Sequence, residues 1–159
     1  MTSESARASS AAEAAYRIPH ANARRRRIAL VALDAGAAAV AERLAEAGFP
    51  RAVALPAAAS GEAWLDVLLA PAREMPGLLA DADHLFLLAS ADGDAAMAGA
   101  VAEAASERGV PVSAFLIAPP SAQDADLARP LSCLRQVAKM LVLARDDADI
   151  GAVLTALRA

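Results

Sequence analysis

The chain has 159 residues, enough for one domain with a sizeable core, and 57% of them are hydrophobic although only 3% are aromatic. A net charge of −4 argues against general nucleic-acid binding. No apolar run reaches the roughly 18 residues of a membrane span, and the single cysteine, Cys133, excludes an internal disulfide and is typical of a reducing cytoplasm.

Residues 1–25 are rich in Ser and Ala without a sustained period, and we expect a disordered tail. Charged residues interrupt its apolar stretches, which argues against a signal peptide. The one basic cluster, Arg24–Arg27, is interpreted as a solubilising flank, with membrane or nucleic-acid contact as the alternative. Residues 26–159 are expected to form the folded domain.

The domain opens with an apolar run at Ile28–Leu33, the pattern of a strand covered on both faces. Asp34–Gly36 is expected to turn the chain into a helix over Ala37–Ala47, which Gly48 ends at the left-handed position that follows many helices. A second strand is predicted at Arg51–Leu55. The short crossover favours adjacent parallel strands.

The next segment is harder to assign. Trp64–Leu69 is too short for periodicity to decide between an edge strand and a helical turn. Trp64 is interpreted as a core anchor, with contact to a partner as the second possibility. Gly77–Ala82 is predicted to end a short helix.

A βαβ unit follows. We predict a strand at His84–Ala89, a helix over Ala95–Arg108 with Asp94 or Asp92 as its N-cap, and a strand at Val110–Ile117. Gly109 is expected to end that helix.

The last third contains two further helices. Asp124–Val137 is predicted to be helical, with Pro130 either kinking or dividing it. A strand at Met140–Ala144 then leads into a helix over Ala148–Arg158, with Asp146–Asp147 at the positive end of its dipole. The alternation predicts an α/β fold: a single three-layer, doubly wound, Rossmann-like domain with a mostly parallel sheet of about five strands.

In such a sheet a ligand site lies at the carboxyl ends of the strands. The candidate binding residues there follow the first and third strands: Asp34, Gly36, Ser90, Asp92, Gly93 and Asp94. Phosphate binding needs a glycine-rich turn, yet each loop has one glycine and places a carboxylate where the anion would lie. Two interpretations stay open: turn and capping residues without a ligand, or a Mg²⁺ ion between Asp34, Asp92 and nucleotide phosphates.

Catalytic groups are sparse. Neither His20 nor His84 has a Ser or Cys neighbour at motif spacing, so the sequence supports no nucleophilic triad. Cys133 lies beside leucines in a helical run and is interpreted as a small core residue. A general base at Asp92 or Asp94 has no partner residue that the sequence identifies.

Three stretches together resemble a known family: Gly77-Leu-Leu-Ala-Asp-Ala-Asp-His-Leu-Phe-Leu-Leu-Ala-Ser90, the helix Ala98–Gly109, and Val110-Pro-Val-Ser-Ala-Phe-Leu-Ile-Ala-Pro119. They are similar to the GTP-binding half of the bacterial tubulin homologue FtsZ, as is Ile28–Leu33 with the helix running to Gly48. The resemblance covers about residues 26–145 and implies a nucleotide-binding Rossmann-like fold. The cobalamin-binding domains are a weaker likeness, because their histidine has no counterpart beside Asp34.

The sequence departs from the pattern of this family in two places. The family's glycine-rich loops would fall on Ala91–Ala96 and on Asp34–Ala39, where only Gly93 and Gly36 remain, and the second domain that supplies its acidic catalytic loop has no counterpart here. We therefore expect a non-catalytic, cytoplasmic accessory or regulatory protein without a cofactor. It would bind a protein partner or a second copy of itself. The alternative is a protein that binds GTP or GDP with Mg²⁺.

Overall fold

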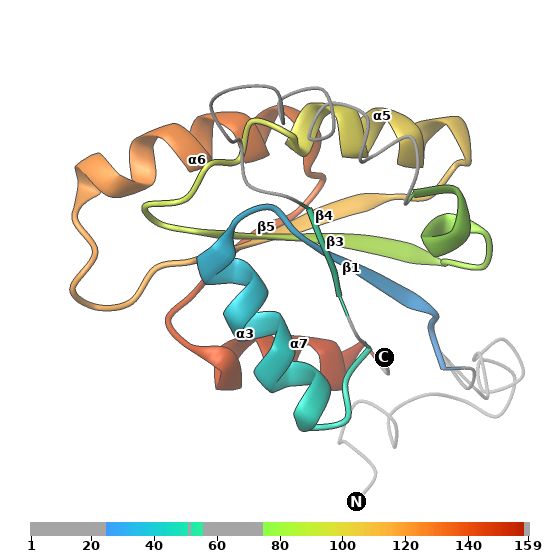
Figure 1. Ribbon diagram of the computed structural model, residues 1–159, viewed down its shortest axis with the longest axis horizontal. Helices are drawn as coiled ribbons and strands as arrows, with labels where there is room; N and C mark the ends of the chain where they lie inside the picture. Colours follow the sequence, from blue (N-terminus) through green and yellow to red (C-terminus); the bar gives the residue numbers. More distant parts are fainter. Residues whose placement is uncertain (1–24, 51, 56–74, 158–159) are drawn as a thin grey trace, which may run out of the picture.

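The computed structural model describes residues 25–50, 52–55 and 75–157. Its five strands form one sheet in the order β2-β1-β3-β4-β5, and every neighbouring pair is parallel. This confirms the expected Rossmann-like α/β fold (Figure 1). The strands are β1 (Ile28–Ala32), β2 (Val53–Ala54), β3 (His84–Ser90), β4 (Val112–Ile117) and β5 (Leu141–Ala144). The helices are α3 (Ala35–Glu46), α5 (Ala98–Glu107), α6 (Asp124–Val137) and α7 (Asp147–Ala156).

The three central strands are buried along most of their length, which is why their sequences are continuous apolar runs without alternation. Helices α3 and α7 cover one face of the sheet, and α5 and α6 cover the other (Figure 1). Phe86 and Phe115 stack at the centre of the sheet with their ring centroids 4.8 Å apart. Elsewhere the core is built mainly from Ala, Val, Leu and Ile, in keeping with a chain that is 57% hydrophobic but only 3% aromatic.

Two helices end in the same hydrogen-bonded motif. Gly48 and Gly109 both have positive φ angles, and each directly follows the C-cap residue of its helix, Ala47 or Arg108. At the first, the amide of Phe49 donates to the carbonyl of Leu44, which closes the turn. The prediction that Gly48 and Gly109 end their helices is confirmed.

Helix α6 has the predicted bounds and runs through Pro130 without dividing. The predicted N-cap of α5 is wrong. Helix α5 begins three residues later than expected, Met97 is its N-cap, and the Asp94 carboxylate instead accepts from the amide of Ala96 in the preceding turn. Short Asx turns of this kind compete with helix capping for the same side chain.

Other boundaries differ by a few residues. The short helix predicted to end within Gly77–Ala82 ends at residue 79, and the strand predicted over Arg51–Leu55 is reduced to Val53–Ala54. The expectations for residues 1–24, for Trp64–Leu69 and for Arg158 lie outside the described residues. Within the described ranges, no helix combines the length and the apolar character that a bilayer crossing requires.

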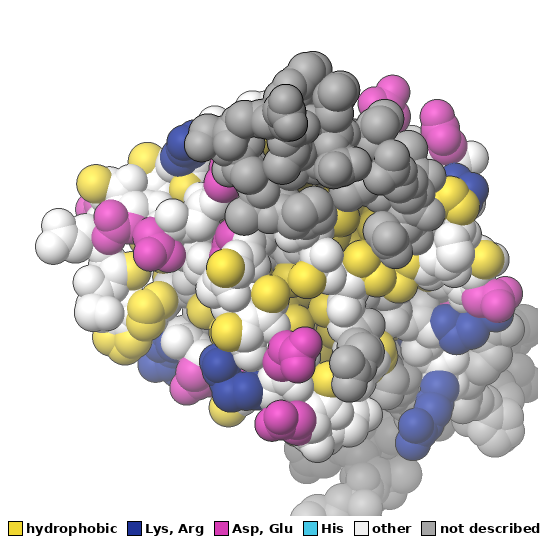
Figure 2. Space-filling model, in the orientation of Figure 1, with side chains coloured by type: hydrophobic (Ala, Val, Ile, Leu, Met, Phe, Trp, Pro, Cys, Tyr) yellow, Lys and Arg dark blue, Asp and Glu magenta, His cyan; other side chains and the backbone are white. Residues whose placement is uncertain are grey.

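Charge is distributed over the surface in both signs, and Figure 2 shows acidic and basic side chains interspersed on the visible face. In the predicted basic cluster, the Arg27 guanidinium lies 3.1 Å from the Asp81 carboxylate and 3.6 Å from that of Asp83. At least one arginine of the cluster is therefore neutralised by its own domain.

Candidate functional site

The strand order creates one topological switch point in the described sheet. From β1 the chain turns to β2 on one side, whereas β3 lies on the other side of β1. The helices that follow β1 and β3 consequently cover opposite faces, and the loops that lead to them diverge. This divergence brings Asp34, after β1, next to Ser90 at the end of β3.

Asp34 and Ser90 are joined by two hydrogen bonds, and we call this pair the Asp34–Ser90 latch. The Ser90 hydroxyl donates to Asp34 Oδ1 at 2.5 Å, and the Ser90 amide donates to Oδ2 at 2.8 Å. Asp34 is also the N-cap of α3, because its Oδ1 accepts from the amide of Ala37 at 2.8 Å. Three donors thus hold the carboxylate, which is only 8% exposed.

Two glycines enclose the latch. A Cβ atom at Gly36 would lie 2.7 Å from Ser90 Oγ, and a Cβ atom at Gly93 would overlap the Asp34 carboxylate and lie 2.7 Å from Ser90 Oγ. Heavy atoms do not approach so closely without displacement. Both positions therefore require glycine for the close packing of the latch, a contact that depends on residues far away in the sequence.

A hollow of about 330 Å³ opens beside the latch at the carboxyl edge of the sheet. Gly36 and Ser90 line it on one side, and Ile117 and the loop after β4 line it on the other. Its remaining lining residues are Ala91, Asp92, Pro119, Ser121, Ala122 and Asp126. A second hollow of about 280 Å³ shares Ala91, Asp92 and Asp126 with the first and extends to Arg129.

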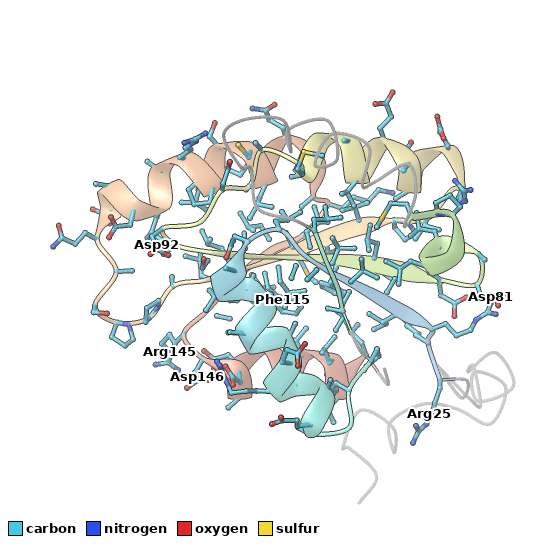
Figure 3. The ribbon with its side chains drawn as sticks, in the orientation of Figure 1. Arg25, Asp81, Asp92, Phe115, Arg145 and Asp146 are labelled. Carbon is cyan, nitrogen blue, oxygen red and sulfur yellow. The ribbon has the colours of Figure 1, made fainter. Side chains whose placement is uncertain are left out.

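The charged groups around these hollows are mostly carboxylates. Asp92 is exposed at the sheet edge (Figure 3) and makes no hydrogen bond or ion pair with another described residue. Asp126 accepts from the amide of Gln123 at the start of α6, and the Arg129 guanidinium lies 3.6 Å from the Asp94 carboxylate. The surroundings of the latch consequently carry more negative than positive charge.

The structure brings four of the six predicted site residues into one group: Asp34, Gly36, Ser90 and Gly93. Asp92 lines the adjoining hollow, and Asp94 caps a turn. Among the described residues, no cluster of three or more His, Cys, Asp or Glu side chains is arranged to hold a metal ion.

Sequence reasoning missed two features of this edge. One is the start of α3: a capping role was open for Asp34, but the helix was expected from Ala37, whereas it begins at Ala35 directly after Asp34. The other is the contribution of α6, whose first turns place Asp126 and Arg129 beside the hollows. That contribution could have been found from chain order, because a helix that follows β4 must begin at the carboxyl edge of the sheet.

A second polar pair lies at the amino ends of the strands, across the sheet from the latch. His84 Nε2 is 2.8 Å from Ser113 Oγ, a spacing that a general base and a nucleophile could adopt. The Ser113 residue is only 1% exposed, however, so its hydroxyl cannot reach a substrate. Burial, reinforced by the charges of Arg26 and Lys139, lowers the pKa of His84, which favours the neutral ring in this contact.

A scan of the sequence against protein-family models and a search of curated proteins each returned no match.

Proposed function

We propose that this protein is a non-catalytic accessory or regulatory protein, built on a degenerate nucleotide-binding fold of the FtsZ and tubulin kind, that acts by binding a protein partner. The observation that carries the proposal is the Asp34–Ser90 latch, which occupies the position at the switch point where a Rossmann-like fold would hold a phosphate. We assign the partner's contact to the 330 Å³ hollow beside the latch, since ligands of such sheets bind at this edge.

The latch opposes phosphate binding in two ways. First, it uses donors that an anion would need, because the amides of Ala37 and Ser90 both donate to the Asp34 carboxylate. Hydrogen bonds to charged groups are worth about 1.5–3 kcal/mol each, so releasing these donors is costly. Second, a phosphate placed about 4 Å from the carboxylate would be repelled by about 4 kcal/mol per unit charge at an effective dielectric constant of about 20.

The second candidate function is binding of GTP or GDP through Mg²⁺. The size and position of the hollow favour it, together with the exposed Asp92 carboxylate that lines it. In this alternative Asp92, rather than the fully hydrogen-bonded Asp34, would contact the ion. The two candidates differ in whether a nucleotide binds at all.

Calorimetric titration of the full chain with GTP, GDP and ATP, with and without Mg²⁺, separates them. We expect no binding up to millimolar nucleotide. Micromolar binding that is lost in Asp92→Ala, and kept in Asp124→Ala as a matched control on the first turn of α6, would establish the Mg²⁺ alternative instead. Micromolar binding that survives in both variants would overturn both assignments of the site.

Partner binding has its own test. Proteins from the native cytoplasm are captured on the full chain, identified, purified and titrated against two tryptophan variants. Ser121→Trp places an indole in the hollow beside the latch. Ser106→Trp is the control: Ser106 is also exposed, but it lines a separate hollow at the amino end of β4. We expect Ser121→Trp to weaken a partner at least tenfold and Ser106→Trp to leave it unchanged. If no purified protein binds, or if both variants bind it equally well, the proposal is wrong.

A further inference from the structure

Strand β5 forms one outer edge of the sheet, with β4 on its inner side. Exposed edges are usually protected against pairing by a lysine, a proline or a bulge within the strand. The sequence of β5, Leu-Val-Leu-Ala, has no charged residue and no proline, and its four residues pair with β4 in unbroken register. At the other edge, β2 comprises only two residues.

Large hydrophobic side chains are exposed at this same edge. Leu143 is 55% exposed and Met140, directly before the strand, is 42% exposed, and they are the two large hydrophobic residues exposed in the described part of the chain. A single exposed hydrophobic side chain needs no explanation, but here two lie three residues apart along one open edge, on opposite faces of the strand, where a pairing strand would contact both.

The backbone of β5 points its free groups outward in a defined pattern. The carbonyls of Met140 and Ala144 accept from the amides of Ala114 and Ala118, on the side of β4. Because successive residues of a strand alternate in direction, the amides and carbonyls of Leu141 and Leu143 face away from β4. The outer edge therefore offers two donors and two acceptors in a row.

We propose that the protein forms a two-fold symmetric dimer in which β5 pairs antiparallel with β5 of a second copy. A two-fold axis normal to the sheet at Val142 sets Leu141 opposite Leu143 of the second copy, so that both outward-facing residues of each strand exchange hydrogen bonds. The same register sets the exposed Met140 opposite the small Ala144. The exposed side chains on each strand thus find a neighbour on the other, which favours a second copy over an unrelated partner.

The residues that flank the strand add one unfavourable contact. Lys139 of one copy would lie opposite Arg145 of the other, although Arg145 also pairs with Asp149 of its own chain at 3.4 Å. Salt screens repulsion between exposed charges, so this dimer should tighten as ionic strength rises. Association through attractive ion pairs would show the opposite dependence on salt.

The oligomeric state tests the proposal. Sedimentation equilibrium of the full chain, from low micromolar to millimolar concentration, should show a monomer–dimer equilibrium. Leu143→Lys should weaken it at least tenfold, whereas Ala54→Lys, an exposed position on the opposite edge strand, should not. A chain that stays monomeric throughout, or a dimer that Leu143→Lys leaves intact, would overturn the proposal.

A cross-linking experiment tests the register itself. Across the two-fold axis, the two Val142 residues form a non-hydrogen-bonded pair with Cα atoms about 4.5 Å apart, within the range that a disulfide spans. With Cys133 replaced by Ser, Val142→Cys should form a covalent dimer on oxidation, but Leu143→Cys should not, because its two copies lie beyond about 7 Å. Efficient cross-linking at 143 and none at 142 would refute this register.

The dimer is independent of the proposed function, because β5 and the hollow beside the latch involve different residues. Nucleotide titration can therefore contradict the proposed function without affecting the dimer, and sedimentation can contradict the dimer without affecting the proposed function.

Discussion

Replacing Gly93 by alanine tests the packing around the latch most directly. The new methyl group would overlap the Asp34 carboxylate and lie 2.7 Å from Ser90 Oγ. The carboxylate cannot move aside freely, since it is buried and three donors hold it. Either the latch opens or the loop after β3 shifts.

The magnitude follows from three contributions to the free energy of unfolding. Overpacking of a filled site costs about 1–3 kcal/mol. Loss of one hydrogen bond to the charged carboxylate costs about 1.5–3 kcal/mol. These two costs are not additive, because the displacement that relieves the overlap is the one that breaks the hydrogen bond. Against them, alanine reduces the entropy of the unfolded chain by about 0.4–1 kcal/mol. We expect a net loss of about 2 kcal/mol.

Urea denaturation followed by circular dichroism measures this loss. With a dependence on denaturant of about 2 kcal/mol/M, the midpoint should fall by roughly 1 M. Gly99→Ala is a matched control, because Gly99 lies in α5 with open space around its Cβ position. That control should stabilise the protein by about 0.5–1 kcal/mol, as expected for a helical glycine.

A second variant identifies the cause. In an Asp34→Ala background the methyl group at position 93 no longer meets a carboxylate, so the additional cost of Gly93→Ala should shrink by at least half. If Gly93→Ala is neutral or stabilising in the wild-type background, the packing argument is wrong. An equal cost in both backgrounds would show that the loop, rather than the latch, requires the glycine.

Two other predictions concern charged groups. Because burial, with Arg26 and Lys139 nearby, lowers the pKa of His84 below its usual 6.5, the unfolded chain takes up the proton first. The stability that neutral His84 confers should thus be complete above about pH 6.5 and should decrease as the pH falls through 6.5 toward the folded-state pKa. Urea midpoints measured between about pH 7.5 and pH 5 should show this decrease in the wild type, and His84→Gln should remove it. The Arg43 guanidinium donates hydrogen bonds to the Asp147 carboxylate, which joins α3 to α7 and lowers the pKa of Asp147 below 3.8. The contribution of this ion pair to the free energy of unfolding should therefore be present above pH 3.8 and lost as the pH falls through the folded-state pKa of Asp147. Because Arg43 and Asp147 are both partly exposed, Arg43→Ala should lower the free energy of unfolding by only about 0.5–1 kcal/mol at low salt, and by less in 1 M NaCl. An equal loss at high salt would contradict an electrostatic origin.

The fold could be predicted from the sequence because its signals are local. The continuous apolar runs at β1, β3 and β4 indicate strands buried on both faces, and such strands occur in parallel sheets between helices. Gly48 and Gly109 mark helix ends for an equally local reason, since glycine adopts a positive φ angle without strain.

Local signals failed where two structures compete for one side chain. Asp94 could cap either a helix or a short turn, and it caps a turn by accepting from the amide of Ala96, whereas α5 begins only at Ala98. Pro130 could divide α6 or remain within it. Its buried position on one continuous helix depends on packing that no local pattern encodes.

The sequence by itself determined the alternation of strands and helices, the acidic and glycine-poor character of the loops after β1 and β3, and hence the expectation that phosphate binds poorly. Only the tertiary structure decided that Asp34 meets Ser90, because the two lie 56 positions apart and come together through the order of the strands. It also decided that Gly36 and Gly93 pack against that pair. The physical reason is that hydrogen bonds and close packing depend on distance in space, whereas a sequence pattern records only distance along the chain.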